Sequence, residues 1–182
     1  MAIGTSWSSS GAFGKLHGLD KVTRNLQKHV MAIEGRTARG LLEAVSHLRE
    51  QMDWVSPTIP VDVGNLRASW FITTKGTKAE GVLFAGARQS ESFKGNPTII
   101  GQLEQSRNQA LKAAKEKLKD VKIGIGFGFS AYYAAYVHEM VGTDINWTRS
   151  GSGAKWFQAA IKREKQTMLI IIRDNAKIKK TP

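Results

Sequence analysis

The chain has 182 residues, of which 41% are hydrophobic and 23% charged, as is typical of one folded globular domain. It carries 27 Lys and Arg against 15 Asp and Glu, and the net charge of +12 favours polyanionic partners. It has no cysteine, which excludes disulfides, thiolate metal sites and cysteine nucleophiles. Its apolar runs are all shorter than the roughly 18 residues that cross a bilayer, so we expect no membrane partner.

The first 17 residues are rich in Ser and Gly and predict a flexible N-terminal arm without a secretory signal. From residue 18 onward, apolar residues recur at helical spacing, and the pattern resumes after Gly35. We therefore predict one long helix that is bent or interrupted near Gly35 and Gly40 and stops before Pro57.

Residues 57–64 contain two prolines and a glycine and predict an ordered loop. A strand is expected over residues 66–74, where β-branched and aromatic residues gather. A turn at residues 75–81 and a second strand at residues 82–85 complete a predicted β-hairpin.

The second half begins with a polar loop at residues 89–97 and a basic amphipathic helix over residues 99–118. Residues 121–129 alternate between apolar residues and mainly glycine, which is the clearest strand pattern in the chain. A short helical segment at residues 131–139, a polar loop at residues 142–153 and a final helix from about Ala154 follow.

This order of elements predicts an α+β fold, because helices and strands do not alternate as they do in a doubly wound protein. A small antiparallel or mixed sheet should pack against the long N-terminal and C-terminal helices, with the basic helix as an addition. We expect a single domain over residues 18–176 and a basic tail over residues 177–182.

The glycines at 124, 126 and 128 do not form a phosphate-binding loop, because their spacing is G-x-G-x-G and they lie inside the predicted strand. A strand face lined by glycine instead predicts the close approach of another backbone. His138 and Glu139 are adjacent, but the H-E-x-x-H pattern of zinc proteases is absent, and a hydrogen-bonding or subunit-contact role is favoured over metal ligation.

Carboxylates that could act in acid-base chemistry are scattered, and no nucleophile elbow is present. We expect no enzymatic activity, no catalytic residue, no cofactor and no metal. Asp62 is interpreted as a cap or turn residue over Gly64 and Asn65.

No DNA-reading or RNA-reading motif is present, and most tryptophans should be core or interface anchors. The basic clusters remain open to two interpretations, a solvated surface or a contact with polyanions such as genomic DNA. The candidates for that contact are Lys112, Lys115, Lys117, Lys119, Lys122, Lys177, Lys179 and Lys180.

Three segments resemble motifs of one family. Pro60-Val-Asp-Val-Gly-Asn-Leu-Arg-Ala-Ser-Trp70 is similar to a P-x-D-T-G-x-L-R-x-S signature, with Val63 in place of threonine. Tyr133-Ala-Ala-Tyr-Val-His-Glu139 resembles a Y-A-x-Y-V-E/H-x-G segment, although Met140 and Val141 precede its glycine. Gly153-Ala-Lys-Trp-Phe157 resembles the element that opens the last helix. The family is the minor tail component, or neck, family of long-tailed bacteriophages of the lambdoid type.

The resemblance implies a structural virion protein that is made in the host cytoplasm and forms a homo-oligomeric ring, or connector, of about six or twelve copies at the head-tail junction. It would complete tail attachment around the DNA path, beside the portal, adaptor, stopper and tail terminator. Residues 88–120 look like a basic insertion relative to the family. The candidate assembly residues are Asp62, Gly64, Leu66, Arg67, Trp70, Tyr133, Tyr136, His138, Glu139 and Trp156.

Two alternatives stay open. The chain could be a tail terminator or another tail-completion ring. It could also be a DNA-binding phage protein that works outside the virion, in which case it should bind duplex DNA with a steep salt dependence. A nuclease is a weaker alternative, because it would need a carboxylate or histidine cluster.

Overall fold

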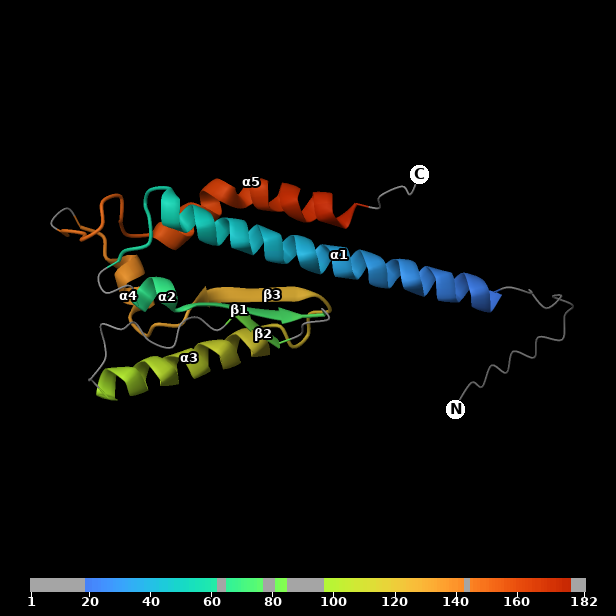
Figure 1. Cartoon of the computed structure of the whole chain (residues 1–182), viewed down its shortest axis with the longest axis horizontal. Coiled ribbons are helices and arrows are strands. Elements are labelled where there is room, and N and C mark those ends of the chain that lie inside the picture. The colour runs from blue at the N-terminus through green and yellow to red at the C-terminus, as the bar shows by residue number, and fades with distance from the viewer. Residues whose placement is uncertain (1–18, 62–64, 77–80, 85–96, 143–144, 178–182) are drawn as a thin grey trace, which may run out of the picture. The chain divides into compact units, whose positions relative to one another are not determined.

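The computed structural model describes residues 19–61, 65–76, 81–84, 97–142 and 145–177 (Figure 1). The chain divides into two compact units, residues 1–32 and residues 33–182. In the first unit the described residues are the start of helix α1. The second unit contains every other element, and the following description concerns it. The predicted arm over residues 1–17 lies outside the described residues.

Helix α1 (Leu19–Trp54) is one continuous helix of 36 residues. The expected interruption near Gly35 and Gly40 is therefore wrong. One glycine costs a helix only about 1 kcal/mol relative to alanine, which is too little to break a helix whose second half contributes buried side chains to the core. Gly40 has a packing function, because a Cβ there would lie 2.9 Å from Asn175 Cβ and 3.0 Å from Ile172 Cα of the last helix.

The strand predicted from Leu66 begins later than expected. Residues 65–68 form a short helix, α2 (Asn65–Ala68), and β1 (Trp70–Lys75) follows. The turn of α2 is closed by the amide of Ser69, which donates to the carbonyl of Asn65 at 3.0 Å. Leu, Arg and Ala are all good helix formers, so local propensity favours this turn. The predicted hairpin is confirmed, since β2 (Gly81–Phe84) pairs antiparallel with β1.

The third strand, β3 (Gly124–Phe129), pairs antiparallel with the other side of β1, and the sheet order is β2-β1-β3. It starts three residues later than the alternation predicts. Its apolar side chains pack against the core, as expected. On its glycine face the close approach is made by side chains of β1 and α3 rather than by another backbone: a Cβ at Gly126 would lie 2.7 Å from Thr73 Oγ1 and 3.3 Å from Ala114 Cβ.

The remaining helices are α3 (Pro97–Lys117), α4 (Ala134–Glu139) and α5 (Trp156–Ala176), close to the predicted ranges. Of the polar loop at residues 89–97, only residue 97 is described, as the first residue of α3. Within the second unit, α1 and α5 lie side by side over one face of the sheet and α3 covers the other (Figure 1).

Most of the hydrophobic core lies between the sheet and the α1 and α5 helices, and Leu103 of α3 also belongs to it. Its most deeply buried members come from α1, from the loop after it and from the start of α5: Val45, Leu48, Met52, Ile59, Trp156 and Ala160. The α+β prediction is thus confirmed, with a small antiparallel sheet against long N-terminal and C-terminal helices. Among the described residues, no helix has the length and apolar character that a membrane span requires.

Candidate assembly surface

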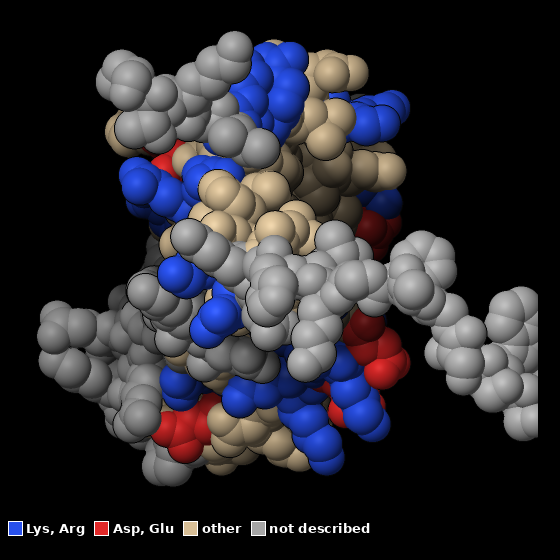
Figure 2. All heavy atoms as spheres, turned by 90° about the vertical axis from the view of Figure 1, so that its right-hand side faces the viewer, with Lys and Arg blue, Asp and Glu red and all other residues tan. Residues whose placement is uncertain are grey.

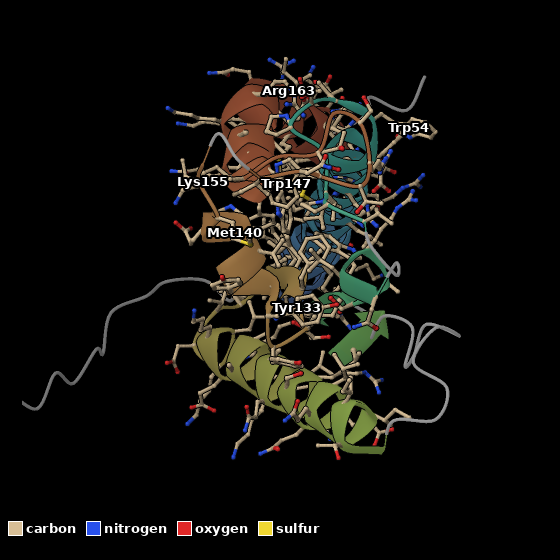
Figure 3. The ribbon with its side chains drawn as sticks, turned by 90° about the vertical axis from the view of Figure 1, so that its left-hand side faces the viewer. Trp54, Tyr133, Met140, Trp147, Lys155 and Arg163 are labelled. Carbon is tan, nitrogen blue, oxygen red and sulfur yellow. The ribbon has the colours of Figure 1, made fainter. Side chains whose placement is uncertain are left out.

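The three family-like segments, which are far apart in the sequence, meet at one end of the second unit, where α1 ends and α5 begins (Figures 1 and 3). Asn65 of α2 donates its side-chain amide to the hydroxyl of Tyr133 at 3.0 Å. The amide of Lys155, just before α5, donates to the carbonyl of His138 at 2.7 Å. The first segment thus contacts the second, and the second contacts the third.

A buried carboxylate holds this end together. Asp53, at the end of α1, accepts two hydrogen bonds from Arg67 at 2.9 and 3.0 Å and pairs with Arg49 at 2.5 Å. Arg149 donates to the backbone carbonyl of Asp53 at 2.6 Å. Burial lowers the pKa of Arg49, and the charge of Asp53 opposes that shift. Sequence reasoning missed this cluster, although the i, i+4 spacing of Arg49 and Asp53 on a helix is a signal for part of it.

An aromatic cluster lies beneath the segments. The ring of Phe129 is 5.1 Å from Trp70 and 4.7 Å from Trp156, with the second pair edge to face. Phe157 lies 6.3 Å from Phe129. Such tilted and edge-to-face pairs add to the burial of the rings themselves. Because Trp70 and Trp156 are 4% and 2% exposed, they belong to the core beneath the surface.

His138 is a structural residue of this end. Its Nδ1 lies 2.8 Å from Glu139 Oε1, and its Nε2 lies 3.4 Å from the amide of Gln158, which donates to it. Lys155 also pairs with Glu139. Burial lowers the pKa of His138, and the positive charge of Lys155 lowers it further. Among the described residues, no group of three or more His, Asp or Glu side chains could hold a metal ion.

The other predicted assembly residues differ in their exposure. Leu66 is buried, and Arg67 is committed to Asp53 although its side chain is 43% exposed. Tyr136 is 70% exposed and free to meet a partner. Asp62 and Gly64 lie outside the described residues, as do Lys179 and Lys180.

Two exposed apolar spots flank this end. We call the first the Trp54 spot; it contains Trp54, which is 73% exposed, and Val55. The second, the α4 spot, contains Tyr132, Tyr136 and Val141. Figure 3 places Trp54 on one side of the molecule and Met140, at the end of α4, on the other. The sequence signal for both spots is a large apolar side chain beside a helix end. Only the structure shows that these side chains are exposed.

The basic candidates do not form one uniform patch. Lys119 pairs with Glu116 at 3.5 Å, and Lys122 pairs with Glu34. Lys177 pairs with Asp174 at 2.8 Å, so its charge is also partly neutralised. Exposed lysines without an ion pair among the described residues remain on α3: Lys112, Lys115 and Lys117. Figure 2 likewise shows Lys and Arg in separate groups, several with acidic side chains beside them.

Comparison with known proteins gives no match to a family model, to a curated protein or to a solved structure.

Proposed function

We propose that this chain is a structural subunit of the head-tail neck of a tailed bacteriophage and that its copies close into a ring around the DNA path. The observation that carries the ring is the placement of the exposed Trp54 on one side of one end of the second unit and of Met140, at the end of α4, on the other. A ring is closed by contacts between two different surfaces of each subunit. A subunit with one exposed aromatic surface on each side meets that requirement.

Ion pairs and hydrogen bonds hold the backbone next to both spots in place. Trp54 directly follows Asp53, whose carboxylate is held by two guanidinium groups. The α4 spot is fixed by the Asn65 hydrogen bond to Tyr133 and by the hydrogen bond between Lys155 and His138. Preformed surfaces lose little conformational entropy on association, and aromatic side chains dominate interface energies. The arrangement therefore suits assembly.

The phage neck assignment depends on the resemblance of the three segments to the neck family. The meeting of the three segments supports it, because residues from separate parts of the chain are linked there by hydrogen bonds. The polar motif residues have packing partners here: Arg67 holds Asp53, and His138 and Glu139 hold the start of α5. We propose that these residues act in assembly and that the chain is not an enzyme.

The first test is the oligomeric state of the full chain, measured by size-exclusion chromatography with light scattering. We expect a ring, and we expect Trp54→Ala and Tyr136→Ala each to convert it to smaller species. Leu169→Ala is the matched control, because Leu169 is 51% exposed but lies on α5 outside both spots. A wild-type chain that stays monomeric at micromolar concentration would contradict the ring.

The second test is the composition of purified virions. Mass spectrometry should detect the chain, and cryo-electron microscopy should place it at the junction between head and tail. Density at the far end of the neck, on the first tail ring, would instead identify a tail terminator. Absence of the chain from mature particles would contradict a virion role.

Lys112, Lys115 and Lys117 favour the alternative of a DNA-binding protein outside the virion, because they are exposed and carry no ion pair within the described residues. That function predicts tight duplex binding by the free chain, with an affinity that falls steeply as salt rises. Weak binding by the free chain, together with its presence in particles, supports the neck ring.

A further inference from the structure

Within the described part of the chain, strand β3 lies at the end of the sheet, and one of its edges pairs with no strand. The amide of Ser130 donates to the carbonyl of Ser69 at 2.9 Å, which fixes the alternation of the β1-β3 ladder. The glycines of β3 therefore point their N–H and C=O groups toward β1. The N–H and C=O groups of Ile125, Phe127 and Phe129 point away from β1, and no other strand of the described chain pairs with them. Such an edge is a template for another strand.

A pocket lies on each side of this edge. The first has a volume of about 240 Å³ and is lined by Phe127 and Phe129 together with Ala135, His138 and Trp156. The second, of about 430 Å³, lies on the glycine face between β3 and α3. Its helical lining includes Ala110, Ala113, Ala114 and Lys117. We call the edge and its two pockets the β3 groove.

The β3 groove has the form that β-strand addition requires. An added strand takes its affinity from main-chain hydrogen bonds to the edge, and its side chains point alternately to the two faces of the sheet. One set of side chains would enter the pocket beside α4 and α5, and the other set would enter the pocket beside α3. Both pockets are lined largely by apolar residues, so the strand should carry no charge.

The chain itself contains a segment of this kind. In Ala2-Ile-Gly-Thr-Ser-Trp-Ser8 the larger residues Ile3, Thr5 and Trp7 alternate with Gly4, Ser6 and Ser8. The segment has no proline, and the first charged residue of the chain is Lys15. β-Branched and aromatic residues favour strands. The 18 residues before α1 span up to roughly 60 Å when extended, so the segment can reach a neighbouring subunit.

We propose that the β3 groove binds residues 2–8 of a second copy of this chain as a fourth strand. The inference rests on the proposed ring, because a segment given to a neighbour links two subunits, whereas a segment folded onto its own β3 would link none. Trp7 is the largest side chain of the segment and serves as its anchor.

The absence of cysteine makes a disulfide test clean. One chain carries Ser6→Cys, and a second, with a C-terminal tag that changes its size, carries Ala113→Cys in one pocket or Ala135→Cys in the other. The two chains are mixed, oxidised mildly and separated by non-reducing electrophoresis. We expect a heterodimer with the pocket that Ser6 faces and none with Gln109→Cys, a control on the exposed surface of α3 outside the groove.

Three results would overturn the proposal. The first is that neither pocket cysteine forms a heterodimer with Ser6→Cys. The second is that Gln109→Cys forms one equally well. A chain carrying both Ser6→Cys and a pocket cysteine could also close its disulfide within one molecule at a dilution that allows no oligomer. That last result would place the segment on its own β3.

A second measurement separates this proposal from the ring itself. Trp7→Ala should raise the concentration at which the oligomer dissociates at least tenfold, and Trp7→Phe should restore most of the loss. Rings that assemble unchanged with Trp7→Ala would refute the fourth strand and leave the ring proposal standing. A disulfide-linked pair from chains that never assemble beyond dimers would refute the ring and leave the fourth strand standing.

Discussion

Asp53 joins three parts of the chain at the candidate assembly surface. Its side chain is 12% exposed and lies between Arg49 of α1 and Arg67 of α2. Its backbone carbonyl accepts from Arg149, in the loop before α5. Removing one partner of a buried ion pair is costly, because the remaining charges keep their loss of hydration and lose their attraction.

Asp53→Asn is accordingly expected to lower the free energy of unfolding by about 3 kcal/mol. The change keeps the shape of the side chain and leaves two guanidinium groups without their counter-charge. Urea unfolding followed by tryptophan fluorescence measures the loss. The matched control is Glu50→Gln, at the exposed neighbouring residue Glu50, which should shift unfolding by less than about 0.5 kcal/mol. Equal midpoints for the two variants would show that the cluster is not stabilising.

We expect His138 to make the stability of the fold depend on pH. Its pKa is lowered by burial and by Lys155, so the folded state resists protonation and the unfolded state binds more protons. The free energy of unfolding should therefore fall as pH drops through about 6.5, the ordinary pKa of histidine. Denaturant midpoints between pH 8 and pH 5 would show the slope. His138→Gln should flatten it and His29→Gln, at an exposed site, should not; equal slopes in wild type and His138→Gln would contradict this assignment.

The acid limb at lower pH has a different source. The pKa of Glu164 is lowered, first by its hydrogen bond with His47 at 2.9 Å and then by Arg163, with burial opposing the shift. A carboxylate whose pKa is lowered on folding stabilises the protein above its unfolded pKa. That stability is lost as pH falls through the folded value, well below the histidine window.

At the scale of elements, the packing of α5 on α1 depends on close approach. Gly40 faces the backbone of Ile172 and the Cβ of Asn175, whereas a Cβ at Gly35 would meet nothing within 4 Å. Asn175 also donates to Glu43 at 2.7 Å, so polar contacts join the two helices near the same place. Glycine at residue 40 thus permits close packing of α5, whereas glycine at residue 35 permits no contact that a larger residue would block.

Substituting alanine at these two glycines should change stability in opposite directions. Gly35→Ala removes backbone freedom from the unfolded chain and should stabilise the fold by up to about 1 kcal/mol. Gly40→Ala should destabilise it by about 1–3 kcal/mol, because the added methyl group forces α5 away from α1. Thermal or urea unfolding of the two variants, compared under identical conditions, measures both signs. Stabilisation by Gly40→Ala would show that the helices separate more easily than their contacts indicate.

At the scale of the whole molecule, the two units differ in whether their described residues belong to the hydrophobic core. All the residues of the hydrophobic core lie in the unit of residues 33–182, from α1 onward. The described residues of the first unit contribute none of them. Apolar residues on its helix, Val22, Leu26, Val30 and Met31, are exposed. We therefore expect residues 1–32 to contact other molecules and the core to form without them.

A chain that begins at Ile33 should consequently unfold in urea with a midpoint close to that of the full chain, within about 0.5 kcal/mol in free energy. It should fail to form the ring, because it lacks the segment proposed for the β3 groove. Circular dichroism and light scattering on the same samples separate these two expectations. A truncated chain that does not fold would show that residues 1–32 are required for the core.

The amino-acid sequence by itself determined the α+β class and the type of every described element except α2, because apolar periodicity and turn residues are local signals. It also predicted that most tryptophans are core or interface anchors, and Trp70 and Trp156 are core residues. It could not determine the continuity of α1, the start of β1 or the partner of Arg67. Each depends on contacts between residues distant in sequence: α5 against Gly40, the α2 turn beside α4, and Asp53 across from Arg67. Only the tertiary structure decided that Trp54 and Tyr136 stay exposed while Trp70 and Trp156 are buried, because burial depends on what the rest of the chain places over a side chain.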